Sequence, residues 1–250
     1  MKTLKKIALI AMCLTLMLGV LCSCAQDKAA DKLVMGTNAA FPPYEFVDDN
    51  GKIVGIDAEI AEAVAKKMGK ELEIKDMEFD SLITAVESKT IDFALAGMTV
   101  TDERLLSVNF SDTYAKGVQV IIVKEGSAIT KVEDLKGKKI GVQTGTTGDI
   151  YCTDEFGQEN VKQYNNGALA VAALNNDQVD CVVIDNEPAK SFVAANTGLK
   201  ILETAYAEED YAAAIAKDNT ELLEAFNAAL KELKADGTIA AIIEKYIPSK

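Results

Sequence analysis

The sequence predicts an α/β protein made of two lobes, and three observations support that prediction. The chain has 250 residues, which is enough for one large domain or two lobes of ordinary size. Its hydrophobic fraction of 49% and charged fraction of 26% are typical of a folded, water-soluble protein, which excludes a disordered chain, a collagen-like repeat and a multi-span membrane protein. From residue 33, short β-type runs alternate with amphipathic helical stretches, a pattern that favours largely parallel sheets flanked by helices.

A tight hairpin is the strongest local signal in the first part of the chain. The turn residues Asp49-Asn50-Gly51 lie between the apolar pairs 46–47 and 53–54, and this arrangement is typical of two short antiparallel strands. The other elements expected before residue 117 are strands at 33–35, 72–74 and 91–96 and helices at 81–88 and 101–106.

Two further helices carry capping signals at their starts. Asp57 is expected to cap a helix over 57–69. Asp218 and Glu221 have the spacing of a capping box at the start of a helix over 218–235.

Two apolar runs, 118–123 and 211–216, are predicted to cross between the lobes. They divide the body of the chain into a first lobe of 33–117 plus 214–250 and a second lobe of 118–213. The remaining elements are expected as strands at 139–142, 161–164 and 181–184 and helices at 146–156, 168–174, 187–195 and 238–246.

Residues 1–23 are interpreted as a lipoprotein signal peptide, because a basic start precedes a long apolar run. Leu21-Cys22-Ser23-Cys24 resembles the bacterial lipobox, with a cysteine before the small residue as its atypical feature. The resemblance makes Cys24 the lipid-attachment residue and 24–32 a linker. A single membrane-spanning anchor is the alternative, since the run is just long enough to cross a bilayer. The expected location is outside the cytoplasm, lipid-anchored to the outer face of the cytoplasmic membrane or periplasmic.

Charge and residue usage exclude several classes of function. The chain has 39 acidic and 26 basic residues, a net charge of −13, which disfavours binding to nucleic acid or anionic lipid. It has no histidine, which excludes Ser-His-Asp triads, HExxH zinc sites and Cys–His dyads. No metal or cofactor is therefore expected. After the leader only Cys152 and Cys181 remain; export permits a disulfide between them, whereas the apolar run around Cys181 favours two buried free thiols.

The segment 94–104 is the most informative for chemistry. A strand ends at Gly97, where a ligand can approach the backbone closely. Thr99 then offers a hydroxyl, and Arg104 can grip a carboxylate through two parallel hydrogen bonds. Taken alone, the segment is equally compatible with an ordinary strand–turn–helix joint that carries a surface arginine.

Six segments carry a recognisable pattern: 36–46 (GTNAAFPPYEF), 55–57 (GID), 96–104 (AGMTVTDER), 110–112 (FSD), 141–147 (GVQTGTT) and 184–185 (ID). In these segments the chain resembles the polar amino-acid-binding proteins of bacterial ABC importers, solute-binding protein family 3, which have the type II periplasmic-binding fold. The segments occur in the family's order, and the resemblance extends from Leu33 to the end.

This resemblance implies roles for individual residues. Arg104, with backbone groups near Thr99 and Thr147, would hold the α-carboxylate of the ligand. Asp185, the Gly97 carbonyl and the Thr99 hydroxyl would hold its α-ammonium. The full set implied or inferred to bind ligand is Asn38, Phe41, Glu45, Phe79, Gly97, Met98, Thr99, Arg104, Gln143, Thr146, Thr147 and Asp185.

General physical chemistry supports part of this assignment. Thr146 and Thr147 begin a predicted helix, where free backbone N–H groups favour an anion. Asp185 lies just past a strand, where α/β crevices bind ligands. A zwitterion removed from water needs both of its charges matched, and Arg104 with Asp185 would supply that pair.

The side chain of the ligand is predicted to be cationic, with arginine as the first candidate. Asn38 stands where lysine-, arginine- and glutamine-binding relatives often carry aspartate, and Gln143 where glutamine binders tend to carry lysine. Phe41 and Phe79 would sandwich the side chain, and their flat faces suit a guanidinium. Glu45 could supply a carboxylate or could equally be a solvated strand residue. The stretch 142–149 also resembles the arginine-binding branch of the family.

Other functions remain open at this point. A neutral polar amino acid such as glutamine, or cystine, is the second choice of ligand. A dehydratase of the cyclohexadienyl type would be an enzyme on the same fold, although the pairing of Arg104 with Asp185 favours binding without reaction. A signalling ectodomain is disfavoured because no segment that could transmit a signal follows Lys250. The expected partners are an amino acid, an ABC permease and the lipid anchor, and the protein is expected to be a monomer.

Overall fold

The computed structural model describes residues 32–202 and 206–248. The predicted signal peptide, Cys24 and the linker up to residue 31 lie outside the described residues, whereas Lys32 begins the first strand. Within the described part, no helix is both long enough and apolar enough to cross a membrane.

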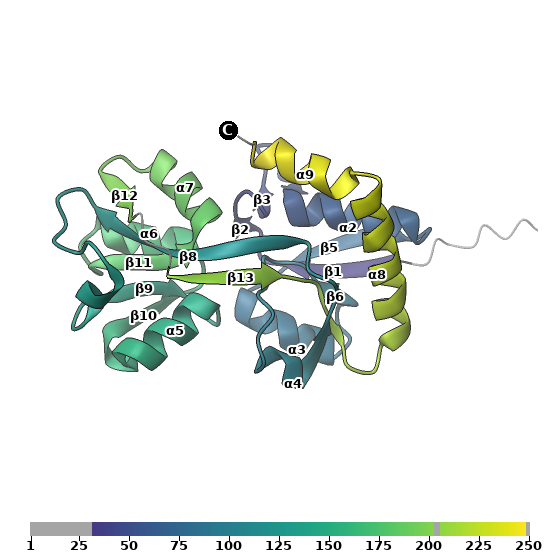
Figure 1. Ribbon diagram of the computed structural model, residues 1–250, viewed down its shortest axis with the longest axis horizontal. Coiled ribbons are helices and arrows are strands. Elements are labelled where there is room, and N and C mark those ends of the chain that lie inside the picture. Colours follow the sequence, from purple (N-terminus) through teal and green to yellow (C-terminus); the bar gives the residue numbers. More distant parts are fainter. Residues whose placement is uncertain (1–31, 203–205, 249–250) are drawn as a thin grey trace, which may run out of the picture. The chain divides into compact units, whose positions relative to one another are not determined.

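The first sheet has five strands in the order β5-β1-β6-β14-β7 (Figure 1). The three strands β5, β1 and β6 run parallel, and β14 runs antiparallel to both of its neighbours. The bounds are β1 Lys32–Thr37, β5 Glu71–Asp76, β6 Phe93–Ala94, β7 Val108–Phe110 and β14 Ala214–Ala216. A separate small sheet is formed by β2 Ala40–Phe41, β3 Glu45–Val47 and β4 Ile53–Val54, which includes the predicted hairpin.

Side chains of the first sheet alternate between two apolar cores, as the period of two in a strand requires. Leu33 and Met35 face the core formed with helices α2 and α8, whereas Val34 packs in the core formed with helix α3. The helices of this part are α2 Ile56–Lys67, α3 Leu82–Glu87, α4 Arg104–Ser107, α8 Thr220–Ala235 and α9 Thr238–Tyr246.

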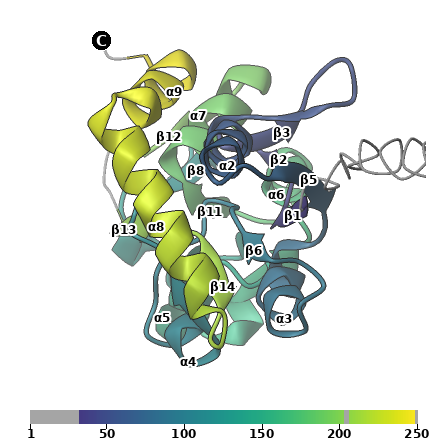
Figure 2. The ribbon, with the colours of Figure 1, turned by 90° about the vertical axis from the view of Figure 1, so that its right-hand side faces the viewer.

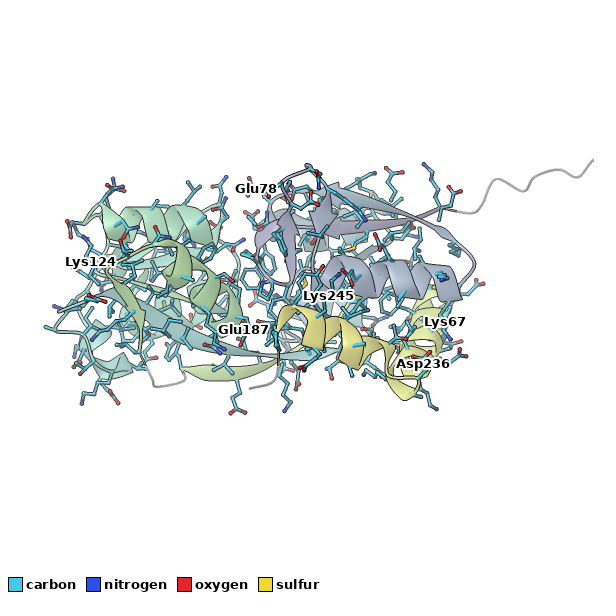
Figure 3. All side chains as sticks on the ribbon, turned by 90° about the horizontal axis from the view of Figure 1, so that it is seen from above. Lys67, Glu78, Lys124, Glu187, Asp236 and Lys245 are labelled. Carbon is cyan, nitrogen blue, oxygen red and sulfur yellow. The ribbon has the colours of Figure 1, made fainter. Side chains whose placement is uncertain are left out.

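The two C-terminal helices pack against α2 and against each other (Figure 2). Ion pairs lie at this contact, between Lys67 and Asp236 at 3.6 Å (Figure 3) and between Lys245 and Glu59 at 2.5 Å. Such exposed pairs contribute little to stability, so the buried apolar face of the helices holds them in place.

The second sheet contains β10-β9-β11-β8-β12, with β13 also paired to β8. Strands β10, β9 and β11 are parallel, and β8 runs antiparallel to β11, β12 and β13. Helix α5 covers one face, and α6 and α7 cover the other (Figure 1). The bounds are β8 Ala115–Lys124, β9 Ile140–Gln143, β10 Val161–Tyr164, β11 Cys181–Asp185, β12 Leu199–Ile201, β13 Ala207–Tyr211, α5 Thr147–Phe156, α6 Gly167–Asn175 and α7 Asn186–Ala195. Three short 3₁₀ turns, Phe79–Ser81, Val132–Leu135 and Gln158–Asn160, complete the described elements.

The chain passes between the two sheets along β8 and β13, which pair antiparallel (Figure 1). The predicted strand 211–216 is in fact two strands, because the chain changes partners between them. Ala212 N–H bonds the Met98 carbonyl at 3.1 Å, and Ala213 N–H bonds Ser111 Oγ at 3.0 Å. The chain therefore leaves β8 at Tyr211 and joins the first sheet at Ala214.

Both predicted capping signals are wrong. Helix α2 begins at Ile56 after Gly55, and the Asp57 side chain is buried and accepts hydrogen bonds from elsewhere in the fold. Helix α8 is capped by Asn219, whose side chain accepts the Leu222 N–H at 3.2 Å, while Asp218 pairs with Lys89 at the surface.

Cys152 and Cys181 are free, buried thiols in the same apolar core, under α5. Burial raises the pKa of the Cys152 thiol to about 12 and raises the pKa of Cys181 as well. Both thiols are therefore protonated at neutral pH.

Candidate functional site

A polar cavity lies where the loops of the first sheet face β9, α5 and β11 of the second. The side chains that line it come from both sheets and from the small sheet, and most of them are buried. The lining residues are Asn38, Phe41, Glu45, Phe79, Ala96, Gly97, Thr99, Arg104, Gln143, Thr146, Thr147 and Asp185.

Eleven of the twelve predicted site residues are thus brought together around one cavity, and Met98 is the exception. Its side chain is fully buried in the core beneath α3, and its carbonyl accepts the Ala212 N–H. Ala96, which belongs to the same matched segment, lines the cavity although it was not predicted. Which part of a ligand each of these residues contacts stays a prediction.

Arg104 is the buried cation of the cavity. It lies in the short helix α4, and Thr101 Oγ1 accepts its backbone N–H at 3.2 Å. The guanidinium donates to the Thr99 carbonyl at 2.8 Å and to the Gly145 carbonyl at 2.9 Å, and it lies over the Phe79 ring at 5.4 Å. Burial lowers the pKa of Arg104, although nearby Glu209 and Asp185 oppose that shift. No ion pair found among the described residues involves Arg104, so the guanidinium is suited to an anionic ligand group.

The N-terminus of α5 faces the same side of the cavity. Thr146 is its N-cap and accepts the Asp149 N–H at 3.3 Å, and Thr147 is the first helical residue. The first-turn N–H groups of a helix have no partner within the helix. Together with Arg104 they form a positively polarised wall.

Asp185 supplies negative charge at the end of β11. Its Oδ2 accepts Gln119 Nε2 at 2.9 Å, and its Oδ1 accepts the Tyr211 hydroxyl in a short hydrogen bond. Burial, reinforced by Glu209, raises the pKa of Asp185 to about 7. The group is therefore poised between its neutral and ionised forms near neutral pH.

Glu209, on β13, is a buried carboxylate that the sequence analysis missed. It accepts Thr99 Oγ1 at 2.8 Å and Gln119 Nε2 at 3.1 Å, and its second oxygen has no partner in the described residues. The alternation of β13 turns Glu209 to the same side as buried Tyr211, whereas Glu208 is exposed. That period of two was the one signal that could have found it.

Glu45 and Asp57 form a second buried acidic pair. Glu45 is fully buried and lines the cavity, so its interpretation as a solvated strand residue is wrong. Asp57 lies behind it and accepts the Gly97 N–H at 2.8 Å and the Tyr114 hydroxyl at 2.7 Å. Burial, followed by the charge of Asp57, raises the pKa of Glu45 well above its ordinary value, and burial raises the pKa of Asp57 to about 6.

Asn38 and Gln143 meet across the cavity. Gln143 Nε2 donates to Asn38 Oδ1 at 2.9 Å, and Asn38 in turn donates to the Met77 carbonyl at 2.8 Å.

Gly97 has φ of +53°, and a Cβ there would lie 2.8 Å from the Phe41 ring. Glycine is therefore required for both the backbone conformation and the close approach of Phe41.

These features define a class: an α/β protein with two main sheets and, between them, a small polar cavity lined by one cationic and several acidic side chains. The chain belongs to the bacterial extracellular solute-binding proteins, family 3, which residues 33–249 match. The predicted type II periplasmic-binding fold is confirmed by the solved structures that share it.

Several proteins are similar over nearly the whole chain. The arginine-binding extracellular protein ArtP of Bacillus subtilis is 36% identical over 249 residues, which cover 95% of each chain. The L-cystine-binding protein TcyJ of Escherichia coli is 31% identical over 88% of this chain and 84% of its own. The solved arginine-, lysine-, histidine-binding protein ArtJ of Geobacillus stearothermophilus is 38% identical, with a TM-score of 0.84 over 88% of this chain and 96% of its own.

Proposed function

We propose that this protein is the extracytoplasmic binding component of an ABC amino-acid importer and that its ligand is a cationic L-amino acid, with arginine as the first candidate. The observation that carries the proposal is the excess of buried acidic side chains over cationic ones. Among the described residues Arg104 is the one cationic side chain that lines the cavity, whereas Glu45 and Asp185 line it and Asp57 and Glu209 lie directly behind. A zwitterion is neutral overall, so a ligand with an additional positive charge suits this excess of acid best.

In the proposed complex, the α-carboxylate lies against Arg104 and the N-terminus of α5. A guanidinium can offer two parallel N–H groups to a carboxylate, and the present partners of Arg104 are two carbonyl oxygens rather than an acid. The α-ammonium lies against Asp185 and the Thr99 hydroxyl. Both assignments were predicted from the sequence, and the grouping of these residues around one cavity supports them.

The side chain of the ligand is directed towards Glu45, Phe41 and Phe79. Both rings line the cavity and offer apolar faces to a guanidinium. Glu45 has two buried oxygens without a donor among the described residues, and a cationic group would satisfy them. The arginine named for several relatives supports the same choice.

Binding is proposed to bring together the predicted lobes 33–117 plus 214–250 and 118–213. Hydrogen bonds already join them at the cavity, among them Arg104 to the Gly145 carbonyl, Gln143 to Asn38 and Thr99 to Glu209. A ligand that touches both sides stabilises the closed arrangement by its differential affinity for that state.

A neutral amide ligand is the second candidate, and one observation favours it. The Asn38–Gln143 pair presents amide groups that could exchange their mutual hydrogen bond for those of a ligand amide. A solved relative described as an ancestral arginine-binding protein was bound to glutamine; it is 44% identical, with a TM-score of 0.84 over 87% of this chain and 98% of its own.

Calorimetry against the twenty amino acids plus ornithine, citrulline and cystine tests the proposal. Arginine and lysine should bind tightest, and a ligand at about 100 times its Kd should add about 2.7 kcal/mol to the free energy of unfolding. Binding of glutamine or cystine with no response to arginine or lysine would reject the cationic assignment. Absence of binding to any of them, together with turnover of cyclohexadienyl acids, would favour the enzymatic alternative over a binding protein.

We further propose that Cys24 carries lipid and that the monomeric protein passes its ligand to a membrane permease. The family is extracellular, and the leader has the features of an export signal. Cys24→Ser should move the protein from the membrane fraction to the soluble fraction. A lipid label that persists in this variant would assign the attachment to Cys22 or indicate an uncleaved anchor.

A further inference from the structure

Glu209 fixes the direction of one hydroxyl in the cavity. Thr99 Oγ1 donates its hydrogen to Glu209 Oε2 at 2.8 Å, and both side chains are buried. A threonine hydroxyl has one hydrogen and two acceptor lone pairs. Because the hydrogen is committed to Glu209, the oxygen of Thr99 can only accept from a group in the cavity.

The backbone and a shared amide hold this arrangement in place. Thr99 forms a β-bridge with Tyr211, and Val100 N–H bonds the Asp210 carbonyl at 3.0 Å, so Thr99 lies directly beside β13. Gln119 Nε2 donates to both Glu209 Oε2 and Asp185 Oδ2, at 3.1 and 2.9 Å. One amide therefore ties the carboxylate that orients Thr99 to the carboxylate that lines the cavity.

We propose that Glu209 is a positioning residue that holds Thr99 as an obligate acceptor for the α-ammonium of the ligand. The inference rests on the proposed function, since it concerns the ammonium end of the same cavity. Without Glu209, the Thr99 hydroxyl can rotate its hydrogen towards the cavity, where it would oppose an N–H donor. Glu209 thereby makes the site selective for ligands that carry a primary ammonium next to the carboxylate, and it acts through Thr99 rather than by touching the ligand.

A matched pair of substitutions separates orientation from charge and size. Glu209→Met has nearly the same length but no strong acceptor, whereas Glu209→Gln keeps an oxygen that can accept from Thr99. Calorimetry with L-arginine should show a Kd raised about tenfold for Glu209→Met and within about threefold of the unmodified protein for Glu209→Gln. Glu208→Ala removes an exposed carboxylate from the same strand and should leave the Kd unchanged.

A double-mutant cycle with Thr99→Val tests whether Glu209 acts through Thr99. In the Thr99→Val background, Glu209→Met should raise the Kd by less than about threefold, because no hydroxyl is left to orient. A tenfold increase in both backgrounds, or equal losses for Glu209→Met and Glu209→Gln, would overturn the inference and indicate a role in charge or folding. Melting temperatures without ligand monitor folding, and Glu209→Ala replaces Glu209→Met if the latter does not fold.

The design also distinguishes failure of this inference from failure of the proposed function. If the unmodified protein does not bind arginine, the same cycle is run with L-lysine, L-glutamine and L-cystine, because the α-ammonium is common to all four. If it binds none of the four, the proposed function fails. Binding that persists without coupling between Thr99 and Glu209 rejects only the positioning role.

Discussion

The two buried acidic pairs differ in how their members are separated. In each pair one carboxylate lines the cavity, Glu45 or Asp185, and the other lies behind it, Asp57 or Glu209. Glu45 and Asp57 lie side by side, and neither Glu45 oxygen has a donor among the described residues. Asp185 and Glu209 are instead bridged by the amide of Gln119.

This difference determines how much negative charge each pair carries. Two carboxylates that face each other in a buried place cannot both ionise, so one proton is retained. In the other pair the hydrogen bonds from Tyr211 and Gln119 lower the pKa of Asp185, but burial and the charge of Glu209 outweigh them and raise that pKa to about 7. Counting buried acids therefore overstates the negative charge of the cavity at neutral pH.

The largest effect is expected from removal of Arg104, the cation that lines the same cavity as Glu45 and Asp185. Arg104→Ala should weaken arginine binding by at least about 100-fold, because a buried carboxylate then has no charged partner. Calorimetry measures the loss, and Lys89→Ala, which removes an exposed cation, serves as the control. Near-native affinity in Arg104→Ala would mean that the carboxylate binds elsewhere.

Asp185→Asn tests the amide-bridged pair. It keeps the shape but removes the charge that faces the α-ammonium, and we expect the Kd for arginine to rise by about 30-fold or more. The same variant should bind lysine and glutamine more weakly by a similar factor, since the α-ammonium is common to all. A loss confined to cationic amino acids would place Asp185 at the side chain instead.

Glu45→Gln tests the directly facing pair and should have a smaller, selective effect. If Glu45 gives up its proton only to a cationic side chain, the Kd for arginine rises about tenfold and that for glutamine changes by less than about threefold. Because burial and the charge of Asp57 raise the pKa of Glu45 well above its ordinary value, Glu45→Gln should also leave the melting temperature nearly unchanged. Equal losses for the two ligands would show that Glu45 does not sense the charge of the ligand.

A change of pH near neutrality should have the smallest effect on affinity. Stability and affinity should change with pH in opposite directions. The pKa of Asp185 is raised to about 7 and that of Asp57 to about 6, above the ordinary aspartate value of 3.8. The folded protein therefore holds protons that the unfolded chain has released, and the free energy of unfolding falls as the pH rises from about 5 to 8, by about 4 kcal/mol for the two groups together. Acidic groups whose pKa is lowered, such as Asp218, lose their contribution only at lower pH.

Affinity for arginine should instead fall as the pH drops below about 7, because Asp185 must be ionised to hold the ammonium. Urea unfolding and calorimetry at pH 5, 6, 7 and 8 measure the two trends on one preparation. Asp185→Asn should abolish most of the pH dependence of affinity. Affinity and stability that vary in the same direction would contradict the assignment.

The fold was largely predictable because it depends on local periodicity. The apolar run 118–123 predicted the interior of β8, and 238–246 coincides with α9. The break between β13 and β14 was not predictable, because the partners that cause it, Met98 and Ser111, are more than 100 residues away along the chain. The cap assigned to Asp57 failed for the same reason, since its donors are Gly97 and Tyr114.

The residues that line the cavity could be predicted where they belong to a matched segment. Most of the site residues that were predicted from these segments line the cavity. Met98 shows, however, that membership of a segment does not fix the direction of a side chain. Glu209 lies outside every matched segment, and its hydrogen bond from Thr99 connects it to the cavity. Such a residue becomes visible when tertiary contacts are known.

The two buried thiols have a practical consequence. Thiolates, not thiols, react with alkylating dyes, and burial raises the pKa of the Cys152 thiol to about 12 and raises that of Cys181 too. The chain also has no tryptophan. In a protein that lacks the leader cysteines Cys13, Cys22 and Cys24, a single cysteine or tryptophan introduced at the rim of the cavity would therefore give a fluorescence signal from that position alone. This suits the protein to development as an optical sensor of its ligand.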